Sequence, residues 1–398
     1  MSQVIELCSI EECTGCEACQ NSCASGCIEM KPDEKGFLLP VINHETCTKC
    51  GLCVKKCPVL NKPQLQRTKT PKVYACWHKD DGVRMKSSSG GLFSVLAESV
   101  LKDNGIVYGA AYDQDMVVRH KGIDAANKLD DLRRSKYVQS EIGNTFKQAK
   151  ENLRQGKKVL FVGTPCQVSG LHSYLGKEYP NLITCDFICH GVPSPKVFKS
   201  YINWLEKKEN KKITSINFRN KKNGWENILS TATTSRNNEI NLSGQKNNFY
   251  YGFVDAVFNR ECCYNCKYMT YPRVADFTLG DFWGIGDKIE FSHSREKKKG
   301  ISLLMVNSEK LSILKTNIVE LEERTRLEAE MRNVHLFKPV SLHPMRDGFF
   351  HDFKKYPFEI IVDKYLKLPI ARKAKIFVKE KFNFSVITRL RKIARQFK

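Results

Sequence analysis

Cysteine is the residue type whose spacing in this chain most clearly indicates chemistry. Residues 13–23 read C-T-G-C-E-A-C-Q-N-S-C, and residues 47–58 read C-T-K-C-G-L-C-V-K-K-C-P. Each run has the spacing C-x2-C-x2-C-x3-C. Three thiolates at this spacing can converge on one face of an iron–sulfur cubane, whereas the fourth points toward a neighbouring site. The two runs therefore predict two metal centres that exchange one ligand with each other.

This exchange is the arrangement of a two-cluster ferredoxin. It assigns a first thiol group, Cys13, Cys16, Cys19 and Cys57, to one 4Fe–4S cluster and a second thiol group, Cys47, Cys50, Cys53 and Cys23, to the other. Zinc is the competing interpretation, but it needs two separated pairs around one ion, and each run overfills that pattern. A disulfide framework is disfavoured further. Cys27 has no position in either run and is predicted to be a small buried residue. Cys8, Cys76 and Cys185 have no partner at ligand spacing and are predicted to be structural.

Another set of cysteines lies far along the chain. Cys166, in G-T-P-C-Q, and Cys189, in C-H-G-V-P-S, each follow a predicted strand, and R-E-C-C-Y-N-C-K-Y contains Cys262, Cys263 and Cys266. Two thiols at strand ends and one C-x2-C pair can complete another four-thiolate site. The third thiol group is predicted to be Cys166, Cys189, Cys263 and Cys266, with zinc or inert buried cysteines as alternatives. Cys166 also begins a predicted helix, where the dipole is expected to favour its thiolate.

Polar and aromatic residues follow this third group in Y-P-R-V-A-D-F-T-L-G-D-F-W-G-I. Arg273, Asp276 and Asp281, with Phe282 and Trp283, form a set that strand propensity alone does not explain. Two interpretations stay open. The set is either a buried ion pair beneath an aromatic lid or the wall of a site for a flat ring.

Small polar residues open a predicted helix at K-S-S-S-G-G, residues 86–91. Serines and glycines at a helix start suit a phosphate, because free backbone N–H groups and the helix dipole point at it. The alternative is a serine N-cap before an ordinary helix, which on these residues alone is favoured. Neither G-K-[ST] nor G-x-G-x-x-G is present, so the stretch is not predicted to be a P-loop or a Rossmann fingerprint.

Strands and helices are predicted to alternate from Val73 to Lys208, which indicates an α/β domain with a largely parallel sheet. Further strands are predicted at residues 213–218 and 228–234. The fold class is thus an α+β ferredoxin-like N-terminal domain, an α/β domain and a basic helical C-terminal tail. The predicted boundaries are 1–60 for the ferredoxin, 61–72 for a linker, 73–150 and 151–320 for two parts of the α/β domain, and 321–398 for the extension.

Composition places the chain in a reducing, cytoplasmic compartment, because 17 cysteines without a hydrophobic leader would oxidise after secretion. The net charge is +22, but residues 364–398 alone hold twelve Lys or Arg and one Glu. Val386, Leu390, Ile393 and Phe397 recur there at helical spacing and predict a cationic amphipathic helix. It is expected to pack on its own protein, to lie on an anionic membrane surface, or to bind an acidic partner or nucleic acid.

With these motifs, the sequence resembles the beta-subunit family of coenzyme F420 hydrogenase/dehydrogenase. The resemblance covers roughly residues 73–308 and rests on an ordered set of motifs: S-S-S-G-G-L-F (87–93), S-K-Y (135–137), G-T-P-C-Q (163–167), C-H-G-V-P-S (189–194), C-Y-N-C (263–266) and R-V-A-D-F-T-L-G-D-F-W-G (273–284). It implies that residues 73–150 are the N-terminal part of a flavin- and F420-reductase-type unit. It also implies FAD beside a 4Fe–4S cluster, and hydride exchange with a deazaflavin or another two-electron partner.

The resemblance makes seven residues candidates for holding the FAD: Ser89, Gly90 and Gly91 at its phosphates, and Ser135, Tyr137, Asp276 and Asp281. Lys136, His190 and Arg273 are the candidates for orienting an anionic substrate or donating a proton. Bacterial proteins that resemble this one are associated with polysaccharide genes, so the deazaflavin substrate does not carry over directly.

The sequence therefore predicts an iron–sulfur flavoprotein oxidoreductase with two ferredoxin clusters, a third 4Fe–4S cluster and FAD. Its expected partner is a redox protein or a small two-electron donor or acceptor. The first alternative is a non-catalytic electron carrier that docks a partner enzyme. The second, suggested only by charge, is a nucleic-acid protein with structural clusters, which the concentration of charge in the tail disfavours.

Overall fold

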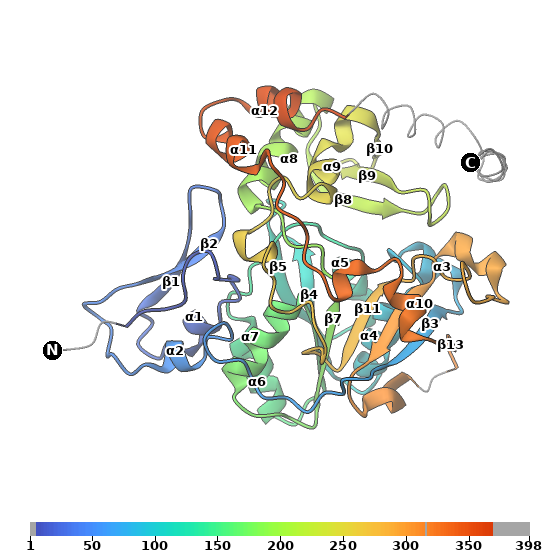
Figure 1. Cartoon of the computed structure of the whole chain (residues 1–398), viewed down its shortest axis with the longest axis horizontal. Coiled ribbons are helices and arrows are strands. Elements are labelled where there is room, and N and C mark those ends of the chain that lie inside the picture. The colour runs from blue at the N-terminus through green and yellow to red at the C-terminus, as the bar shows by residue number, and fades with distance from the viewer. Residues whose placement is uncertain (1–4, 315–316, 369–398) are drawn as a thin grey trace.

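The computed structural model describes residues 5–314 and 317–368. Within them the largest element is an eight-stranded sheet with the order β13-β3-β12-β11-β7-β6-β4-β5 (Figure 1). The central strands pair in parallel: β11 (Phe277–Asp281), β7 (Leu182–Phe187), β6 (Val159–Val162) and β4 (Ile106–Tyr112). Antiparallel strands flank them: β5 (Val118–Ile123) on one side, and β12 (Ser302–Val306), β3 (Lys72–His78) and β13 (Val319–Arg324) on the other. The predicted α/β class is confirmed, but the sheet is parallel only in its centre.

Helices cover both faces of this sheet. Helix α4 (Leu92–Lys102) packs on one face, and α6 (Thr145–Arg154) and α7 (Pro165–Leu175) pack on the other. Because side chains alternate along a strand, Val107 faces α4 while the next residue, Tyr108, faces α6 and α7. Two short helices, α3 (Asp81–Met85) and α5 (Leu129–Leu132), lie in the connections around α4.

A smaller α+β unit lies beside the sheet (Figure 1). It contains the antiparallel strands β8 (Ile213–Asn220), β9 (Leu229–Thr234) and β10 (Glu239–Leu242), and the helices α8 (Pro195–Glu209), α9 (Asn248–Val254), α11 (Arg346–Phe353) and α12 (Phe358–Tyr365). They share one aromatic core that includes Tyr201, Phe218, Phe249, Phe258 and Phe349. The two strands predicted after α8 are therefore confirmed, but they form a separate sheet.

The cysteine-rich N-terminal segment forms its own small unit, as Figure 1 shows. It consists of α1 (Ala18–Ser22), the antiparallel hairpin of β1 (Ile28–Pro32) and β2 (Leu38–Ile42), and α2 (Leu52–Lys55). Residues 61–71 then run without helix or strand to β3, as expected for a linker. This segment is nevertheless anchored, because the Arg67 side chain is 4% exposed and lies 3.3 Å from Asp276.

Two of the predicted domain boundaries fall inside regular elements. The division at 150/151 lies within α6, and the division at 320/321 lies within β13, which pairs with β3 in the large sheet. The described part of the extension also contains α10 (Arg326–Glu330), α11 and α12. The predicted amphipathic helix at 386–397 lies outside the described residues. Among residues 5–314 and 317–368, no helix has the length and apolar character needed to cross a bilayer.

Candidate iron–sulfur and redox site

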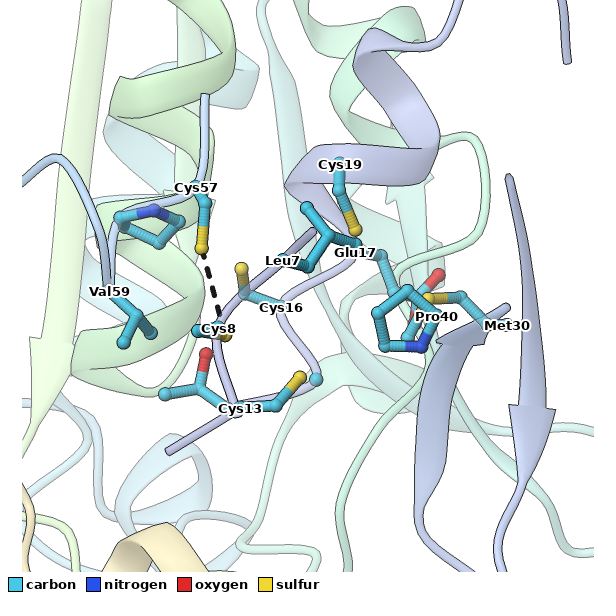
Figure 2. Close-up of a pocket in the computed structure, with 13 residues that line it drawn as sticks. Leu7, Cys8, Cys13, Cys16, Glu17, Cys19, Met30, Pro40, Cys57 and Val59 are labelled. Atoms are coloured by element: carbon cyan, nitrogen blue, oxygen red, sulfur yellow. Dashed lines mark hydrogen bonds between the residues drawn. The ribbon is translucent and has the colours of Figure 1, made fainter. Parts of the chain in front are cut away.

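All members of the first thiol group line one pocket (Figure 2). Cys13, Cys16 and Cys19 come from the loop and first turn of α1, and Cys57 approaches from the segment after α2. Cys8, predicted to be structural, lines the same cavity, and its Sγ lies 3.9 Å from Cys57 Sγ. A hydrogen bond with Cys8 lowers the pKa of Cys13 and that of Cys57 to about 6. These thiols around one cavity fit a 4Fe–4S cluster.

The second thiol group lies next to Cys19 of α1, in a small core of its own. Cys23 and Cys47 pack around the buried Cys53, while Cys50 is exposed in the loop between Cys47 and Cys53. The pKa of Cys53 is raised by burial and then by the charges of Cys23 and Cys47. Cys27 is buried as predicted, and its Sγ lies 3.3 Å from Cys23 Sγ. Among the described residues, no group of three or more His, Cys, Asp or Glu side chains converges closely enough to hold a single metal ion.

Buried polar contacts fix the N-terminal unit against the α/β domain. Arg260, which is 2% exposed, donates from Nε to the Cys13 backbone oxygen at 2.7 Å and from Nη2 to the Leu38 oxygen at 3.0 Å. Its Nη1 donates to Gln139 Oε1 at 3.0 Å. Across the same boundary, the Glu17 carboxylate accepts hydrogen bonds from the backbone of residues 142–143, each at 2.7 Å. The position of the first thiol group relative to the sheet is therefore set by specific contacts.

Helix α7 brings the first and third thiol groups together. Its N-terminus is closed by a capping box: Thr164 Oγ1 accepts from the Gln167 backbone, and Gln167 Oε1 accepts from the Thr164 backbone. This cap fixes Cys166 in the first turn. One turn later, a Cβ atom on Gly170 would lie 3.0 Å from Cys16 Sγ, so Cys16 packs against bare helix backbone.

The third thiol group assembles at the carboxyl ends of β6 and β7. Burial and the neighbouring Cys166 and Cys266 raise the pKa of Cys189, which indicates that these three thiols lie together. Cys263 lies against the Cys189 loop, because a Cβ on Gly191 would be 3.0 Å from Cys263 Cβ. Cys262 is also close. Burial makes the largest change to the pKa of Cys166, raising it, the hydrogen bond with Thr164 lowers it, and the charge of Cys262 raises it further. The structure thus brings the predicted cysteines together and adds Cys262 as a rival fourth ligand.

The acidity expected for Cys166 is wrong for the metal-free thiol. Its position at a helix N-terminus predicts a lowered pKa, yet burial raises the pKa of this thiol. Desolvation of the thiolate outweighs the hydrogen bond with Thr164, which acts in the opposite direction. A thiol of this kind is suited to a metal ligand that loses its proton on binding, rather than to a free nucleophile.

A second polar region combines three of the predicted cofactor residues. Ser135 donates from its backbone to Ser88 Oγ at 2.9 Å, so the S-K-Y triplet meets the S-S-S-G-G loop. Tyr137 stacks on Phe253, with ring centroids 4.6 Å apart. Burial raises the pKa of Tyr137, and the nearby charges of Arg219 and Asp281 shift it in opposite directions.

Aromatic rings enclose the Arg219–Asp281 ion pair, whose N···O distance is 3.1 Å. Trp225 Nε1 donates to Asp281 at 2.9 Å, and the Trp225 ring stacks on Trp283 with centroids 4.5 Å apart. The Arg219 guanidinium lies 4.9 Å from the Trp283 centroid, while its buried Nη2 has no hydrogen-bond partner. The two features expected from the sequence, an ion pair and an aromatic wall, lie side by side here: Asp281 pairs with Arg219, and Trp283 stacks on Trp225. Phe282 instead belongs to the core beneath the sheet.

The Ser89–Gly91 loop directs its polar groups into the protein. Ser89 Oγ donates to the Ile301 oxygen at 2.9 Å, and the Gly90 N–H donates to Ser302 Oγ at 2.9 Å. A Cβ on Gly90 would lie 2.5 Å from the Cys76 oxygen, which shows how closely the loop packs on β3. Gly91 has φ 93°, a conformation that favours glycine, and caps α4. The Ser89 hydroxyl and the Gly90 N–H thus already donate within the protein, so neither of these two groups is free for a phosphate.

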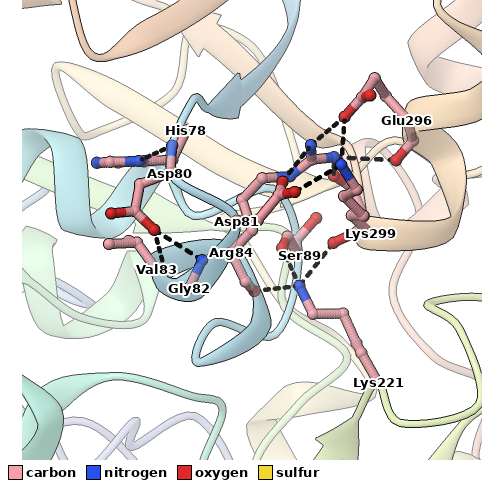
Figure 3. A network of polar contacts seen from close by, with 11 residues as sticks. His78, Asp80, Asp81, Gly82, Val83, Arg84, Ser89, Lys221, Glu296 and Lys299 are labelled. Carbon is pink, nitrogen blue, oxygen red and sulfur yellow. Dashed lines mark hydrogen bonds and ion pairs between the residues drawn. The ribbon is translucent and has the colours of Figure 1, made fainter.

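Two buried cations, Lys221 and Arg84, form a hydrogen-bond network beside the Ser89–Gly91 loop (Figure 3). Lys221 donates to the backbone oxygens of Ser89, at 2.6 Å, and Lys299, at 2.8 Å, and to that of Arg84. The Arg84 side chain pairs with Glu296 and donates to the Gly300 oxygen at 2.8 Å. This network connects the loop to the end of β8 and to the segment before β12.

Two predicted site residues lie in buried ion pairs away from the aromatic wall. Arg273 is 2% exposed, and its Nη2 lies 3.1 Å from Asp186 Oδ2. Asp276 is 1% exposed and accepts hydrogen bonds from the Thr184 backbone, at 2.8 Å, and from Lys310, at 3.2 Å. With Arg67 as a further partner, Asp276 anchors the linker to the sheet. The contacts of Arg273 and Asp276 are therefore those of structural residues.

The remaining catalytic candidates also have intramolecular partners. Lys136 Nζ donates to the backbone oxygens of Asp131, at 2.8 Å, and Arg133, at 2.7 Å, at the end of α5, and burial lowers its pKa to about 7. His190 Nε2 donates to the Val254 oxygen at 2.9 Å, and His190 Nδ1 lies 2.8 Å from His335 Nε2. Burial lowers the pKa of His190. His190 follows Cys189 directly and so borders the third thiol group.

The sequence interpretation missed several residues of these sites. Arg219, Lys221 and Trp225 lie in R-N-K-K-N-G-W, a polar segment between two predicted strands. A run of cations directly after a strand was the available signal. Cys8 and Arg260 gave no such signal, because their roles depend on contacts between distant segments.

Two separate segments of the chain match protein-family models. Residues 156–331 match the model that describes the C terminus of the beta subunit of coenzyme F420 hydrogenase/dehydrogenase, and residues 12–61 match the 4Fe-4S dicluster domain. These matches confirm the resemblance identified from the motifs.

Curated relatives match only the N-terminal unit. The ferredoxin-type protein NapF of Haemophilus influenzae is 39% identical over 44 residues, which are 11% of this chain and 25% of that protein. NapF of Escherichia coli K12 is 33% identical over 54 residues, 14% of this chain and 33% of that protein. The chain therefore spans a quarter to a third of the length of these relatives. Among solved structures, a chain of the F420-reducing [NiFe] hydrogenase complex from Methanosarcina barkeri aligns with a TM-score of 0.43 and 15% identity, covering 69% of this chain and 90% of that one.

Proposed function

From the 4Fe-4S dicluster domain at residues 12–61 and the match of residues 156–331 to the C terminus of a coenzyme F420 hydrogenase/dehydrogenase beta subunit, we propose that this chain is an iron–sulfur oxidoreductase. It passes electrons between the clusters of its N-terminal unit and a redox site in the α/β domain. The observation that carries the proposal is the contact of Cys16 with α7, one turn from Cys166. It supports a continuous path from the first thiol group to the third.

The three thiol groups hold the clusters in this proposal. Cys13, Cys16, Cys19 and Cys57 bind the first, Cys47, Cys50, Cys53 and Cys23 bind the second, and Cys166, Cys189, Cys266 and Cys263 bind the third, with Cys262 as the rival for the last position. A 4Fe–4S cluster supplies one-electron transfer at a potential set by its surroundings. The chain's own residues fix the order of the groups, since Arg260, Gln139 and Glu17 hold the N-terminal unit in place.

FAD is the proposed partner of the third cluster. Support for this placement comes from the residue types beside Trp283, which stacks on the buried Trp225, and from the Arg219 Nη2 donor, which has no partner. A flavin converts between one-electron and two-electron transfer when bound. Ser135, Tyr137 and Asp281 border this aromatic wall, whereas the Ser89 hydroxyl and the Gly90 N–H already donate to other acceptors.

A small two-electron donor or acceptor, F420-like or of another class, is the proposed substrate, and a redox protein is the proposed partner. His190 is the proposed proton-handling residue, because it lies beside Cys189 and its Nδ1 is 2.8 Å from Nε2 of the partly exposed His335, a pair of nitrogens that can share one added proton. Lys136 and Arg273 are less suited to contact a substrate, because their donors serve internal acceptors.

Anaerobic purification of the full chain, followed by assays of iron, sulfide, zinc and flavin, tests the proposal. Three 4Fe–4S clusters correspond to about twelve iron atoms and about twelve sulfides per chain. Cys189→Ala is expected to remove about four iron atoms, and comparison of Cys262→Ala with Cys263→Ala identifies the last ligand. A chain that contains zinc in place of iron contradicts the proposal. A chain with iron but no flavin is instead the non-catalytic electron carrier.

A further inference from the structure

Two cysteines outside the ligand motifs lie beside cluster ligands. Cys8 lines the cavity of the first thiol group, with its Sγ 3.9 Å from Cys57 Sγ (Figure 2). Cys27 Sγ lies 3.3 Å from Cys23 Sγ, beside the second thiol group. Each group of four predicted ligands therefore has a fifth thiol within reach.

The fifth thiol has the same position in both groups. Cys57 and Cys23 are the last cysteines of their runs, the ones that cross to the other run's cluster. Three ligands of each cluster share one tight loop, but the fourth arrives from a separate segment. The extra thiol lies next to this fourth ligand in both cases, so it can occupy nearly the same point in space without moving the other three.

A cysteine that only fills space has different surroundings in this protein. Cys76 is fully buried in the core between the sheet and α4, and its thiol donates to the Ser302 backbone oxygen at 3.4 Å. Cys8 is partly exposed and faces four thiols across a cavity. This contrast indicates that Cys8 is placed for chemistry with the cluster rather than for packing.

We propose that Cys8 and Cys27 are reserve cluster ligands, Cys8 replacing Cys57 in the first thiol group and Cys27 replacing Cys23 in the second. The inference rests on the proposed function, because it requires both groups to hold 4Fe–4S clusters. In each exchange one iron–sulfur bond breaks and one forms. The incoming thiol releases a proton, the departing thiolate takes one up, and no electron is transferred.

Iron and sulfide content of cysteine variants of the full chain, purified without oxygen, tests the inference. Cys57→Ala is expected to keep the wild-type iron content, whereas Cys19→Ala, in the loop that carries three of the ligands, loses about four iron atoms per chain. The double variant Cys8→Ala/Cys57→Ala is expected to lose about the same four. Cys76→Ala controls for removal of a buried cysteine. Cys23→Ala, Cys53→Ala and Cys23→Ala/Cys27→Ala repeat the comparison in the second group.

Alkylation of the folded, cluster-loaded protein provides a second readout. Cys8 is expected to react with iodoacetamide in the wild type and to become protected in Cys57→Ala, as peptide mass spectrometry would show. The inference is overturned if Cys57→Ala loses as much iron as Cys19→Ala, or if the double variant retains its iron. It is also overturned if Cys8 reacts equally in both proteins. A wild type without iron–sulfur clusters contradicts the proposed function itself and is recognised before any variant is made.

Discussion

Cys16 Sγ lies against the backbone of Gly170, where an added Cβ would be only 3.0 Å from the sulfur and 2.9 Å from Cys16 Cβ. Atoms this close must move apart, and neither a cluster ligand nor a helix backbone moves freely. The absence of a side chain at Gly170 thus allows the first thiol group to approach the helix that carries Cys166. This contact links the N-terminal unit to the helix that carries Cys166 of the third thiol group in the proposed electron path.

Gly170→Ala is expected to slow electron transfer from the N-terminal clusters to the third site and to destabilise the folded protein by about 1–3 kcal/mol, the usual cost of overpacking. Stopped-flow reduction and the midpoint of thermal unfolding measure the two effects. Gly348→Ala in α11 is the matched control, because its added Cβ would meet only the end of the Tyr365 side chain, at 3.2 Å. Equal reduction rates in wild type and Gly170→Ala would show that the contact does not limit transfer.

Arg260→Met is expected to loosen the N-terminal unit from the α/β domain. The variant leaves the backbone oxygens of Cys13 and Leu38 without their donor, at a cost of about 3 kcal/mol for buried hydrogen bonds to a charged group. Faster proteolysis in residues 61–71 and a separate unfolding transition would report the loosening. Lys267→Met removes an exposed ion pair with Glu12 across the same boundary and should change little. If both variants behave alike, Arg260 does not fix the two units.

The parts that could be predicted from sequence are those whose determinants lie close together in the chain. Cys13, Cys16 and Cys19 lie around one pocket because one loop carries all three, and strand β4 was predicted correctly from its own apolar residues. The partnership of Cys8 with Cys57 joins residues 49 positions apart, so no local pattern reveals it. The same holds for Asp276, whose role depends on Arg67 from the linker.

Polar residues in the R-V-A-D-F-T-L-G-D segment show a related limit. Their spacing indicated a site, but burial decided which of them belong to it. Arg273 and Asp276 point into the protein, whereas Asp281, at the end of β11, reaches Arg219 and Trp225. Sequence gives the residue types, but only the fold determines whether a guanidinium faces a carboxylate or a ligand.

Arg273→Met is expected to lower the stability of the protein by about 3–5 kcal/mol, because it leaves the buried Asp186 carboxylate without its partner. The double variant Arg273→Met/Asp186→Leu should recover part of this loss, since no unpaired charge remains. Urea unfolding of the three proteins measures the difference. Arg332→Met, at an exposed pair with Asp287, is the control. An Arg273→Met protein of normal stability but weakened substrate binding would instead support the direct role predicted from sequence.

His120 provides a prediction for pH. Its Nε2 lies 3.0 Å from the Val162 oxygen and its Nδ1 lies 2.5 Å from Ser140 Oγ, so the neutral ring donates to the carbonyl and accepts from the hydroxyl. Burial lowers the pKa of His120 to about 4, below its ordinary value of 6.5. Between these two values the unfolded chain binds more protons than the folded one, so the free energy of unfolding falls as pH decreases through this window. From pH 7 to 5.5 the contribution of this residue is about 1 kcal/mol.

His120→Gln removes this titration and is expected to flatten the decline of the unfolding midpoint between pH 7 and 5.5, although its absolute stability is lower. The measurement is thermal unfolding of the cluster-loaded protein under anaerobic conditions at several pH values in this range. His293→Gln is the control, because that ring is half exposed and its side chain lies 4.0 Å from Glu322 at the surface. The two positions differ in solvation, because an exposed imidazolium keeps its hydration. Protonated His120 would instead carry its charge in the interior, with one N–H facing the Val162 carbonyl and the other facing Ser140, and no water around it. A decline of equal slope in wild type and His120→Gln would show that other groups govern the acid sensitivity of the fold.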